Sequence, residues 1–295
     1  MVKPHIRIGT RGSDLALWQA NHVKTQLETL GCSVSIQIIQ TQGDRIQDLG
    51  FDKLEGKGFF TKEIESALLN GSIDLAVHSH KDLETTPPPG LVIAAVSERE
   101  DPSELLLLRT ESHDPSKIFE LKVGARIGTS SARRQSIIRN FRSDLDIVEL
   151  RGNVPTRIEK LRNGQYDAIL LAKAGVSRLR LDTSDLITIT LNPKEFVPAP
   201  AQGVLGLQVR ETDNKTYNWV KKLNYVPSEQ IIQIERGVLQ NMEGGCQLPL
   251  GVYNDGEVVH VAYAKSNHEA ALLIKFPLEG NQDPVPSIVE SLLSL

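Results

Sequence analysis

Lys81 and Asp82 belong to the segment His78-Ser79-His80-Lys81-Asp82, which directly follows the mostly apolar residues 73–77, and this position makes them candidates for chemistry. The apolar segment is typical of a buried strand, and polar residues at the carboxyl end of such a strand lie where α/β proteins bind ligands. There an aspartate can stabilise positive charge or handle a proton, and a lysine can hold an anion. Lys-Asp neighbours are also common on protein surfaces, so the pair alone is a weak signal. His78 and His80 precede it, but no further histidine or cysteine cluster completes a metal site, and no metal is expected.

Cys246 is the candidate nucleophile. Gly244 and Gly245 precede it, and the backbone freedom of glycine can expose a sulfur atom to a cleft. The alternative is a small buried hydrophobe, which is the commoner role of a lone cysteine. Cys32 fits that alternative, because it follows the helix-ending Gly31 and precedes a strand. Two cysteines in 295 residues predict no disulfide framework and favour a reducing compartment.

Residues 126–180 concentrate positive charge, with twelve Lys or Arg against five Asp or Glu in a chain whose net charge is −4. Ten of the twelve are arginines, whose planar fork matches carboxylates and phosphates two bonds at a time. Some of them can be ordinary solvated charges of surface helices: Arg139, Arg142, Arg162 and Arg180. Four others stand in the first turn of a predicted helix or between a strand end and the next helix: Arg133, Arg134, Arg151 and Arg157. Aromatic residues make up only 5%, which disfavours base stacking, so a small compound with several carboxylates or phosphates is the predicted ligand.

An alternation of strands and helices positions these candidates. The first block reads as strand 6–9, a helix from Ser13 to Gly31, strand 34–39, a helix near 61–69, and strands 73–77 and 91–96. The second block, from about residue 104, reads as strands 105–108, 126–128, 147–150 and 168–172 with helices 131–141 and 154–162, and strand 204–209 follows. The last quarter reads as a helix near 229–242, strands 258–262 and 271–276, and a helix near 288–293. This order predicts an α/β fold with mostly parallel sheets and a small C-terminal α+β domain.

A short internal repeat links the two blocks. Arg7-Ile8-Gly9-Thr10 recurs as Arg126-Ile127-Gly128-Thr129, each time at the end of a strand that leads into a helix starting at a serine. A match of four residues can arise by chance between two ordinary turns. The shared context favours two related lobes, each with a helix N-terminus suited to bind an anion.

Length and composition exclude several classes of protein. A chain of 295 residues predicts two domains, or three if one is small. With 40% hydrophobic and 24% charged residues it is neither disordered nor fibrous. The N-terminal residues lack the apolar stretch of a secretory signal, and no segment is apolar for the roughly 18 residues that a membrane span requires. We therefore expect a cytoplasmic protein with no membrane partner.

Six motifs, in order along the chain, resemble those of the porphobilinogen deaminase (hydroxymethylbilane synthase) family. They are Gly9-Thr10-Arg11-Gly12-Ser13 followed by Leu15-Ala16-Leu17-Trp18-Gln19-Ala20, Gly56-Lys57-Gly58-Phe59-Phe60-Thr61-Lys62-Glu63, His78-Ser79-His80-Lys81-Asp82, Gly128-Thr129-Ser130-Ser131-Ala132-Arg133-Arg134-Gln135, Leu150-Arg151-Gly152-Asn153-Val154 and Glu243-Gly244-Gly245-Cys246. The resemblance runs from about residue 5 to residue 255.

The resemblance implies a transferase that joins four porphobilinogen units head to tail into the linear tetrapyrrole hydroxymethylbilane and releases ammonia, in haem biosynthesis. It implies a dipyrromethane cofactor bound covalently to Cys246, and Asp82 as the catalytic residue. The basic residues that it assigns to carboxylate binding are Arg11, Lys81, Arg133, Arg134, Arg151, Arg157 and Arg178. Ser79, Thr129 and Ser131 resemble hydrogen-bonding members of the same site. Each pyrrole carries an acetate and a propionate, which agrees with the positive charge of residues 126–180.

The family fold implies two lobes like those of periplasmic binding proteins and a third domain that carries the cysteine. We expect lobe 1 at residues 1–100 and 198–219, lobe 2 at 101–197 and the C-terminal domain at 220–295. The expected protein is a monomer whose partner is the small molecule porphobilinogen.

Four positions depart from the family pattern. His80 stands where Met or Leu is common, Glu84 where Pro is common, and Ala201 where Gly is usual, while Pro155 replaces a frequent Gly or Asn. None removes a named chemical group. Glu84 adds negative charge two residues from Asp82 and is expected to raise the pKa of that carboxyl.

Two other functions fit parts of the sequence. A binding protein of the same two-lobe fold would capture an anion without chemistry, but it would need neither Cys246 nor Asp82. A nucleic-acid regulator would need a basic charge balance or a recognition helix, and neither is found.

Overall fold

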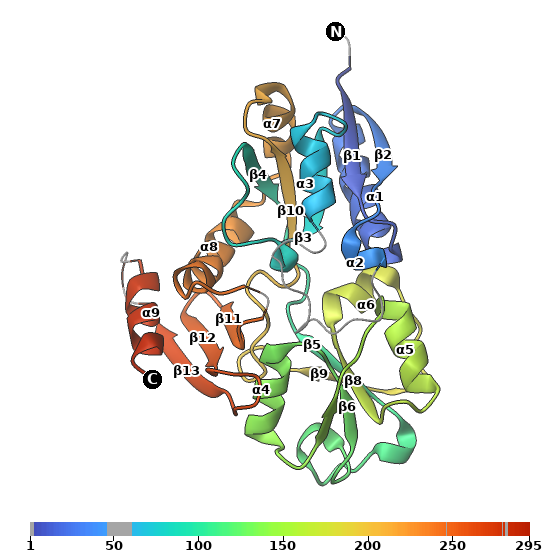
Figure 1. Ribbon diagram of the computed structural model, residues 1–295, viewed down its shortest axis with the longest axis vertical. Helices are drawn as coiled ribbons and strands as arrows, with labels where there is room; N and C mark the ends of the chain where they lie inside the picture. The colour runs from blue at the N-terminus through green and yellow to red at the C-terminus, as the bar shows by residue number, and fades with distance from the viewer. Residues whose placement is uncertain (1–2, 46–60, 246, 279, 281–282) are drawn as a thin grey trace. The chain divides into compact units, whose positions relative to one another are not determined.

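The computed structural model describes residues 3–45, 61–245, 247–278, 280 and 283–295 (Figure 1). The chain forms two compact units, Met1–Glu100 with Gly203–Gln230, and Asp101–Gln202 with Ile231–Leu295. This division is coarser than the three expected domains, whose boundaries at 198 and 220 stay predictions. No helix in the described ranges is long and apolar enough to cross a membrane.

The first unit is built on a five-stranded sheet in the order β2-β1-β3-β10-β4. The strands are β1 (His5–Thr10), β2 (Ser33–Ile38), β3 (Leu75–Ser79), β4 (Leu91–Val96) and β10 (Leu205–Arg210). β1 is parallel to β2 and β3, and β10 runs antiparallel to both β3 and β4. The helices are α1 (Asp14–Thr29), α2 (Gln42–Arg45), α3 (Lys62–Leu69) and α7 (Asn214–Val220), and the short 3₁₀ turns η2 (His80–Asp82) and η5 (Lys221–Leu223) complete the unit.

Alternation along β3 separates two small cores. Leu75 and Val77 pack with Val23 and Leu27 of α1, whereas Ala76 packs with Ile64 of α3. Successive strand residues point to opposite faces, so the neighbours His78 and Ser79 are directed to the α3 side and the α1 side respectively. The end of β3 therefore supplies polar groups to both faces of the sheet.

The second unit repeats this topology with the strand order β7-β6-β8-β5-β9. Its strands are β5 (Glu104–Leu108), β6 (Arg126–Gly128), β7 (Asp146–Val148), β8 (Ala168–Ala172) and β9 (Ile187–Leu191). Its helices are α4 (Ala132–Phe141), α5 (Val154–Arg162) and α6 (Lys173–Leu179), with 3₁₀ turns at Thr110–Ser112 (η3) and Ile118–Glu120 (η4). β6 is parallel to β7 and β8, and β5 is antiparallel to β8 and β9. The matching strand orders confirm two related lobes with mostly parallel sheets.

A small antiparallel sheet completes the second unit and confirms the predicted C-terminal α+β domain. It consists of β11 (Leu250–Asn254), β12 (Val258–Tyr263) and β13 (Leu272–Pro277), with α8 (Val226–Asn241) and α9 (Val285–Leu293). The sheet is fastened to α4, because the Ala271 amide donates to the Ser136 carbonyl at 2.9 Å and Arg139 Nε donates to the Asn267 carbonyl at 3.1 Å. Helix α4 thus joins this domain to the second lobe.

The repeated motif ends in the same kind of helix start in both lobes. Ser13 caps α1 by accepting from the Ala16 amide, and Ser131 caps α4 by accepting from the Arg134 amide. A serine in extended conformation before a helix satisfies one of the amides that have no partner within the helix. Both predicted helix starts are confirmed.

Candidate functional site

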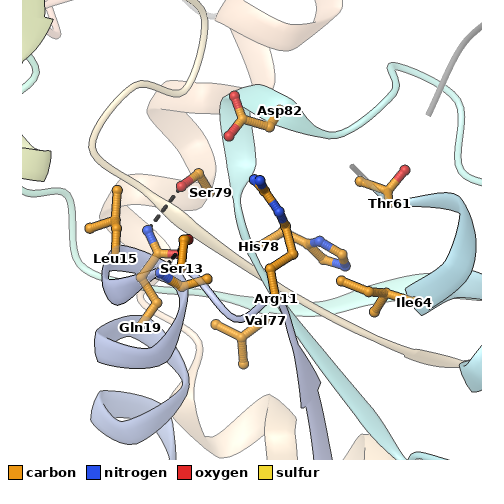
Figure 2. A pocket seen from close by; sticks show the side chains of 11 residues that line it. Arg11, Ser13, Leu15, Gln19, Thr61, Ile64, Val77, His78, Ser79 and Asp82 are labelled. Atoms are coloured by element: carbon orange, nitrogen blue, oxygen red, sulfur yellow. Dashed lines mark hydrogen bonds between the residues drawn. The ribbon is translucent and has the colours of Figure 1, made fainter. Parts of the chain in front are cut away.

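A pocket lies in the first unit where β1 and β3 end (Figure 2). The described residues that line it are Arg11, Ser13, Leu15, Ala16, Gln19, Thr61, Ile64, Val77, His78, Ser79 and Asp82. We call it the Asp82 pocket. It brings together three predicted site residues, Arg11, Ser79 and Asp82, while Lys81 is not among its lining side chains.

Asp82 is placed by a short turn that follows β3 without a loop. The His80 amide donates to the Val204 carbonyl at 2.9 Å, and the Leu83 amide donates to the His80 carbonyl at 3.2 Å. Gly206 in β10 leaves room for this turn, since a Cβ there would lie 2.8 Å from Leu83 Cδ1 and 3.2 Å from His80 Cδ2. The turn is therefore held by backbone hydrogen bonds and by close packing, which places Asp82 at the pocket.

Ser79 is oriented by Gln19, a side chain to which sequence analysis assigned no role. Gln19 Nε2 donates to Ser79 Oγ at 2.9 Å, and Gln19 is buried. Because its oxygen already accepts, the Ser79 hydroxyl can donate its own hydrogen to a ligand. The available signal was position: Gln19 lies beside Ala20 on the helix stripe that also carries Val23 and Leu27, where a polar residue must have a buried partner.

Arg11 supplies positive charge to the same pocket. It follows β1 directly, and Figure 2 shows its side chain extending toward Asp82. The pocket thus offers both a carboxylate and a guanidinium, together with the hydroxyls of Ser13 and Ser79. Such a set can bind a molecule that carries carboxylates at one end and develops positive charge at another.

Arg133 and Arg134 lie in the second unit at the start of α4, and a buried glutamate pairs with both. Arg133 Nη2 and Arg134 Nη2 donate to the two carboxylate oxygens of Glu104, each at 2.6 Å. Arg133 Nη1 also donates to the Val197 carbonyl and Arg134 Nη1 to the Leu170 carbonyl. Glu104 is fully buried. Sequence analysis did not assign this structural role to Glu104, and direct binding of ligand carboxylates by the two arginines stays a prediction.

Two features of this ion network still favour an anion. Two guanidinium groups and one carboxylate leave a net charge of +1 in a buried place. Arg134 Nε, also buried, has no hydrogen-bond partner among the described residues. A buried donor without a partner is costly, so it suits a ligand that can accept from it.

Thr129 and Ser131 stand next to this network. The Ser131 amide donates to Thr129 Oγ1 at 3.2 Å, while Ser131 Oγ accepts from the Arg134 amide at 3.5 Å. Both residues therefore shape the start of α4. Their hydroxyl hydrogens keep the capacity to donate to a ligand.

Arg151 and Arg157 flank the start of α5, which Asn153 caps by accepting from the Thr156 amide at 2.9 Å. Arg157 Nε donates to the Gly152 carbonyl at 2.7 Å, and Arg151 Nη2 lies 3.7 Å from Glu149 Oε1. Arg178, in α6, is buried. The structure places all three in the second unit, with the α4 arginines.

Position 246 lies outside the described residues, as do residues 56–60 of the second motif. Its neighbours belong to the segment between α8 and β11. The Gly244 amide donates to the Leu239 carbonyl, and the Leu248 amide donates to the Gly245 carbonyl, both at 3.1 Å. A Cβ at position 244 would lie 2.6 Å from Leu248 Cδ2, so Gly244 is closely packed against that side chain, whereas Gly245 faces open space.

The protein has two lobes of like topology. One lobe carries a pocket with an acidic and a basic side chain, and the other carries a buried arginine pair. Together they define a class of α/β protein that binds small anions. The family model described as "Porphobilinogen deaminase, dipyromethane cofactor binding domain" matches residues 6–218. The chain belongs to the porphobilinogen deaminase family.

Relatives named porphobilinogen deaminase support this membership over most of the chain. The protein of Nitratidesulfovibrio vulgaris (strain DP4) is 48% identical over 250 residues, which cover 83% of this chain and 77% of the relative. That of Syntrophobacter fumaroxidans is 44% identical, with 83% and 78% covered, and that of Helicobacter hepaticus is 46% identical, with 83% and 75% covered. A solved structure of an ancestral cationic amino acid solute binding protein superposes with a TM-score of 0.43 at 14% identity, covering 77% of this chain and 89% of its own. The two-lobe fold is defined by the strand orders given above.

The chain is thus a transferase that polymerises porphobilinogen into hydroxymethylbilane in tetrapyrrole biosynthesis, with a dipyrromethane cofactor. The described residues fit such a group, because its carboxylates would find a buried network of net positive charge and the unpartnered Nε of Arg134. When bound, the cofactor supplies the pyrrole carbon at which the chain begins to grow.

Proposed function

We propose that Asp82 is the catalytic residue of this transferase. When ammonia leaves porphobilinogen, positive charge spreads over the exocyclic methylene and the pyrrole nitrogen. A fixed carboxylate that faces the ring stabilises this charge more than it stabilises the neutral substrate, and only such a difference lowers the barrier. The observation that carries the proposal is the rigid turn that holds Asp82 at the pocket beside Arg11.

We further propose that the basic residues bind the carboxylates of the cofactor and of the growing chain. In the first unit these are Arg11 and Lys81, with Ser79 as a hydrogen-bond donor. In the second unit they are Arg133, Arg134, Arg151, Arg157 and Arg178, with Thr129 and Ser131. Cys246 is proposed to hold the cofactor through a thioether, because a thiolate is a far stronger nucleophile than an alcohol.

Substitution of Asp82 tests its role. Asp82→Asn keeps the shape and loses the charge, and by analogy with a lost oxyanion-hole donor it should lower turnover at least ~10²-fold. Asp82→Glu keeps the charge but displaces it by one methylene, and displacements near 1 Å can also cost ~10²-fold. The alternative is that Asp82 only caps its loop, in which case Asn, an equal cap, should preserve function. Product formation is measured beside thermal unfolding, and a folded Asn variant within a few-fold of wild type removes Asp82 from the mechanism.

The protein is proposed to act as a monomer in the cytoplasm without nucleic acid. Its net charge of −4 and its aromatic content of 5% support the absence of a nucleic-acid partner. Light scattering of the purified protein reads the oligomeric state directly, and a dimer mass would reject the monomer.

A further inference from the structure

A row of buried polar side chains lies behind the Asp82 pocket. Thr61 Oγ1 donates to Glu65 Oε2 at 3.4 Å, Gln208 Nε2 donates to Glu65 Oε1 at 3.1 Å, and Gln208 Oε1 lies 3.1 Å from His78 Nε2. All four side chains are buried, and His78 also lines the pocket. We call Thr61, Glu65, Gln208 and His78 the Glu65 row. It connects α3 to β10 and β3, and the sequence reading assigned no role to Glu65 or Gln208.

The chemistry of the row fixes the direction of each hydrogen bond. An ionised carboxylate only accepts, so Glu65 must receive an N–H from the Gln208 amide. The carbonyl oxygen of Gln208 is thereby turned to His78, and a carbonyl oxygen also only accepts. His78 must then carry a hydrogen on Nε2. Glu65 therefore determines, through Gln208, which ring nitrogen of His78 carries the hydrogen, although Glu65 makes no hydrogen bond to the ring itself.

The imidazole is also kept neutral. Burial and, to a smaller extent, the charge of Arg11 outweigh the hydrogen bond with Gln208 and lower the pKa of His78 from 6.5 to about 4. A neutral imidazole with hydrogen on Nε2 has its lone pair on Nδ1. Since Gln208 occupies Nε2, any hydrogen bond that His78 offers to a ligand is that of an acceptor.

Few charges act on the row from the elements around it. Burial raises the pKa of Glu65, the hydrogen bonds from Gln208 and Thr61 oppose this, and the negative charge of Glu84 adds to the rise. Of the strands packed against α3, β4 carries no charged residue, while Arg7 of β1 and Arg210 of β10 pair with Asp74. Among the described residues, Arg11 is the charge that shifts the pKa of His78. The negative charge of Glu84 therefore raises the pKa of Glu65. The effect expected of Glu84 on Asp82 stays a prediction.

We propose that Glu65 and Gln208 are positioning residues that hold His78 as a neutral imidazole with hydrogen on Nε2, so that it presents an acceptor and no charge to the Asp82 pocket. The inference rests on the proposed role of Asp82. The lone pair on Nδ1 of His78 can accept a hydrogen bond from a pyrrole N–H of the substrate. It repels the substrate carboxylates, which bind to the arginines instead. An imidazolium would oppose the positive charge that Asp82 is there to stabilise.

The state of His78 can be read from its ring nitrogens. In protein labelled with [¹⁵N]histidine, long-range ¹H–¹⁵N spectra distinguish protonated from unprotonated ring nitrogens, and a His78→Asn spectrum assigns the signals among the seven histidines. In wild type we expect a single form, with Nε2 protonated and Nδ1 bare, unchanged between about pH 6 and pH 8 because the pKa of His78 lies below this range. A hydrogen on Nδ1, or protonation of His78 near its ordinary pKa, would overturn the proposal.

Glu65→Gln tests the origin of that state. A glutamine can present either its oxygen or its NH₂ to Gln208, so the direction of the row is no longer fixed and the single form of His78 should be lost. Glu63→Gln is the matched control, because Glu63 is on the same helix and accepts from the Gln42 amide instead. It should leave the His78 signals unchanged.

Gln208→Met removes the connecting amide with little change in size and serves if Glu65→Gln does not fold. It should also lose the single form. Retention of that form in either folded variant would reject the role of Glu65 and Gln208. The spectra are taken without substrate, so this result is independent of turnover by the Asp82 variants.

Discussion

At the scale of single residues, Glu104 determines how the arginines of α4 are arranged. It opens the strand Glu104–Leu108, whose other residues are all leucine, and it is fully buried. A buried charge in an apolar strand requires an opposite charge, and here two arginines share it. Its carboxylate holds both guanidinium groups at fixed positions before any ligand binds.

Replacing Glu104 by Gln should destabilise the protein strongly. Two buried guanidinium groups would lose their shared negative charge, and breaking a buried ion pair typically costs about 3–5 kcal/mol. Urea unfolding of the variant measures the loss. Glu111→Gln is the control, because Glu111 is largely exposed beside Arg109 and should change stability by less than about 1 kcal/mol. An equally small effect at Glu104 would show that the network contributes little.

Cys246→Ser should abolish activity and leave the fold intact. An alcohol captures the reactive methylene of the cofactor precursor far less readily than a thiol does. Intact-mass spectrometry of the wild type should show the 32.6 kDa polypeptide plus two linked pyrrole units, and the serine variant should show the polypeptide alone. Cys32→Ser is the control and should keep both cofactor and turnover, since Cys32 is buried in the core of the first lobe. Normal turnover by the Cys246 variant ends the assignment.

The sequence identified those site residues that local pattern reveals. Asp82 stands just after a strand, and Ser13 and Ser131 precede helices, so a short window of sequence was enough. Gln19 and Glu104 act through partners about 60 and 30 residues away, and no local pattern reports such a contact. In both cases the available signal was a polar residue among apolar ones. Such a residue needs a polar partner in the folded protein, but the sequence does not show which residue that partner is.

At the scale of elements, two of the segments that sequence analysis did not predict, α6 and β11, lack the usual sequence signals of a helix start or a strand. Helix α6 follows β8 directly, and Ala172 at its start provides no side-chain cap. Strand β11 contains Gly251, a weak strand former, because a Cβ there would lie 2.7 Å from the Val197 carbonyl oxygen. A contact distant in sequence therefore explains the glycine in β11.

The start of α5 should matter for chain growth. Arg151→Leu removes one bidentate partner for a carboxylate, and a charged hydrogen bond of this kind contributes about 1.5–3 kcal/mol. Because the product gains carboxylates at each step, the variant should accumulate partial chains of particular length or fail to assemble cofactor. Native mass spectrometry after limited substrate shows which occurs.

Arg162→Leu is the matched control, since Arg162 lies at the other end of the same helix and pairs with Asp185 on the surface. It should give the wild-type distribution of intermediates. If the Arg151 variant gives that distribution too, Arg151 does not bind the growing chain.

At the scale of the whole molecule, acid should unfold the first unit partly through Asp74. Burial alone would raise the pKa of this carboxyl, but hydrogen bonds from Arg7 and Arg210 outweigh burial and lower the pKa from 3.8 to about 2. A lowered pKa in the folded state gives stability that is present above about pH 4 and is lost as the pH falls through about 2. At 1.36 kcal/mol per pKa unit this is about 2 kcal/mol.

Asp74→Asn should therefore be less stable than wild type by about 2 kcal/mol at pH 7, with a difference that shrinks as the pH falls from 4 toward 2. Urea midpoints at a series of pH values measure this. A difference that stays constant down to the lowest pH at which both proteins fold would mean that the ionisation of Asp74 is not the cause.

The position of β10 has a consequence for synthesis on the ribosome. This strand lies between β3 and β4, yet residues 205–210 emerge more than a hundred residues after both. Until then β3 and β4 each expose an unpaired edge, and such edges invite association with other chains. We infer that the sheet of the first lobe stays incomplete while the second lobe is translated. During this interval the nascent polypeptide depends most on chaperones.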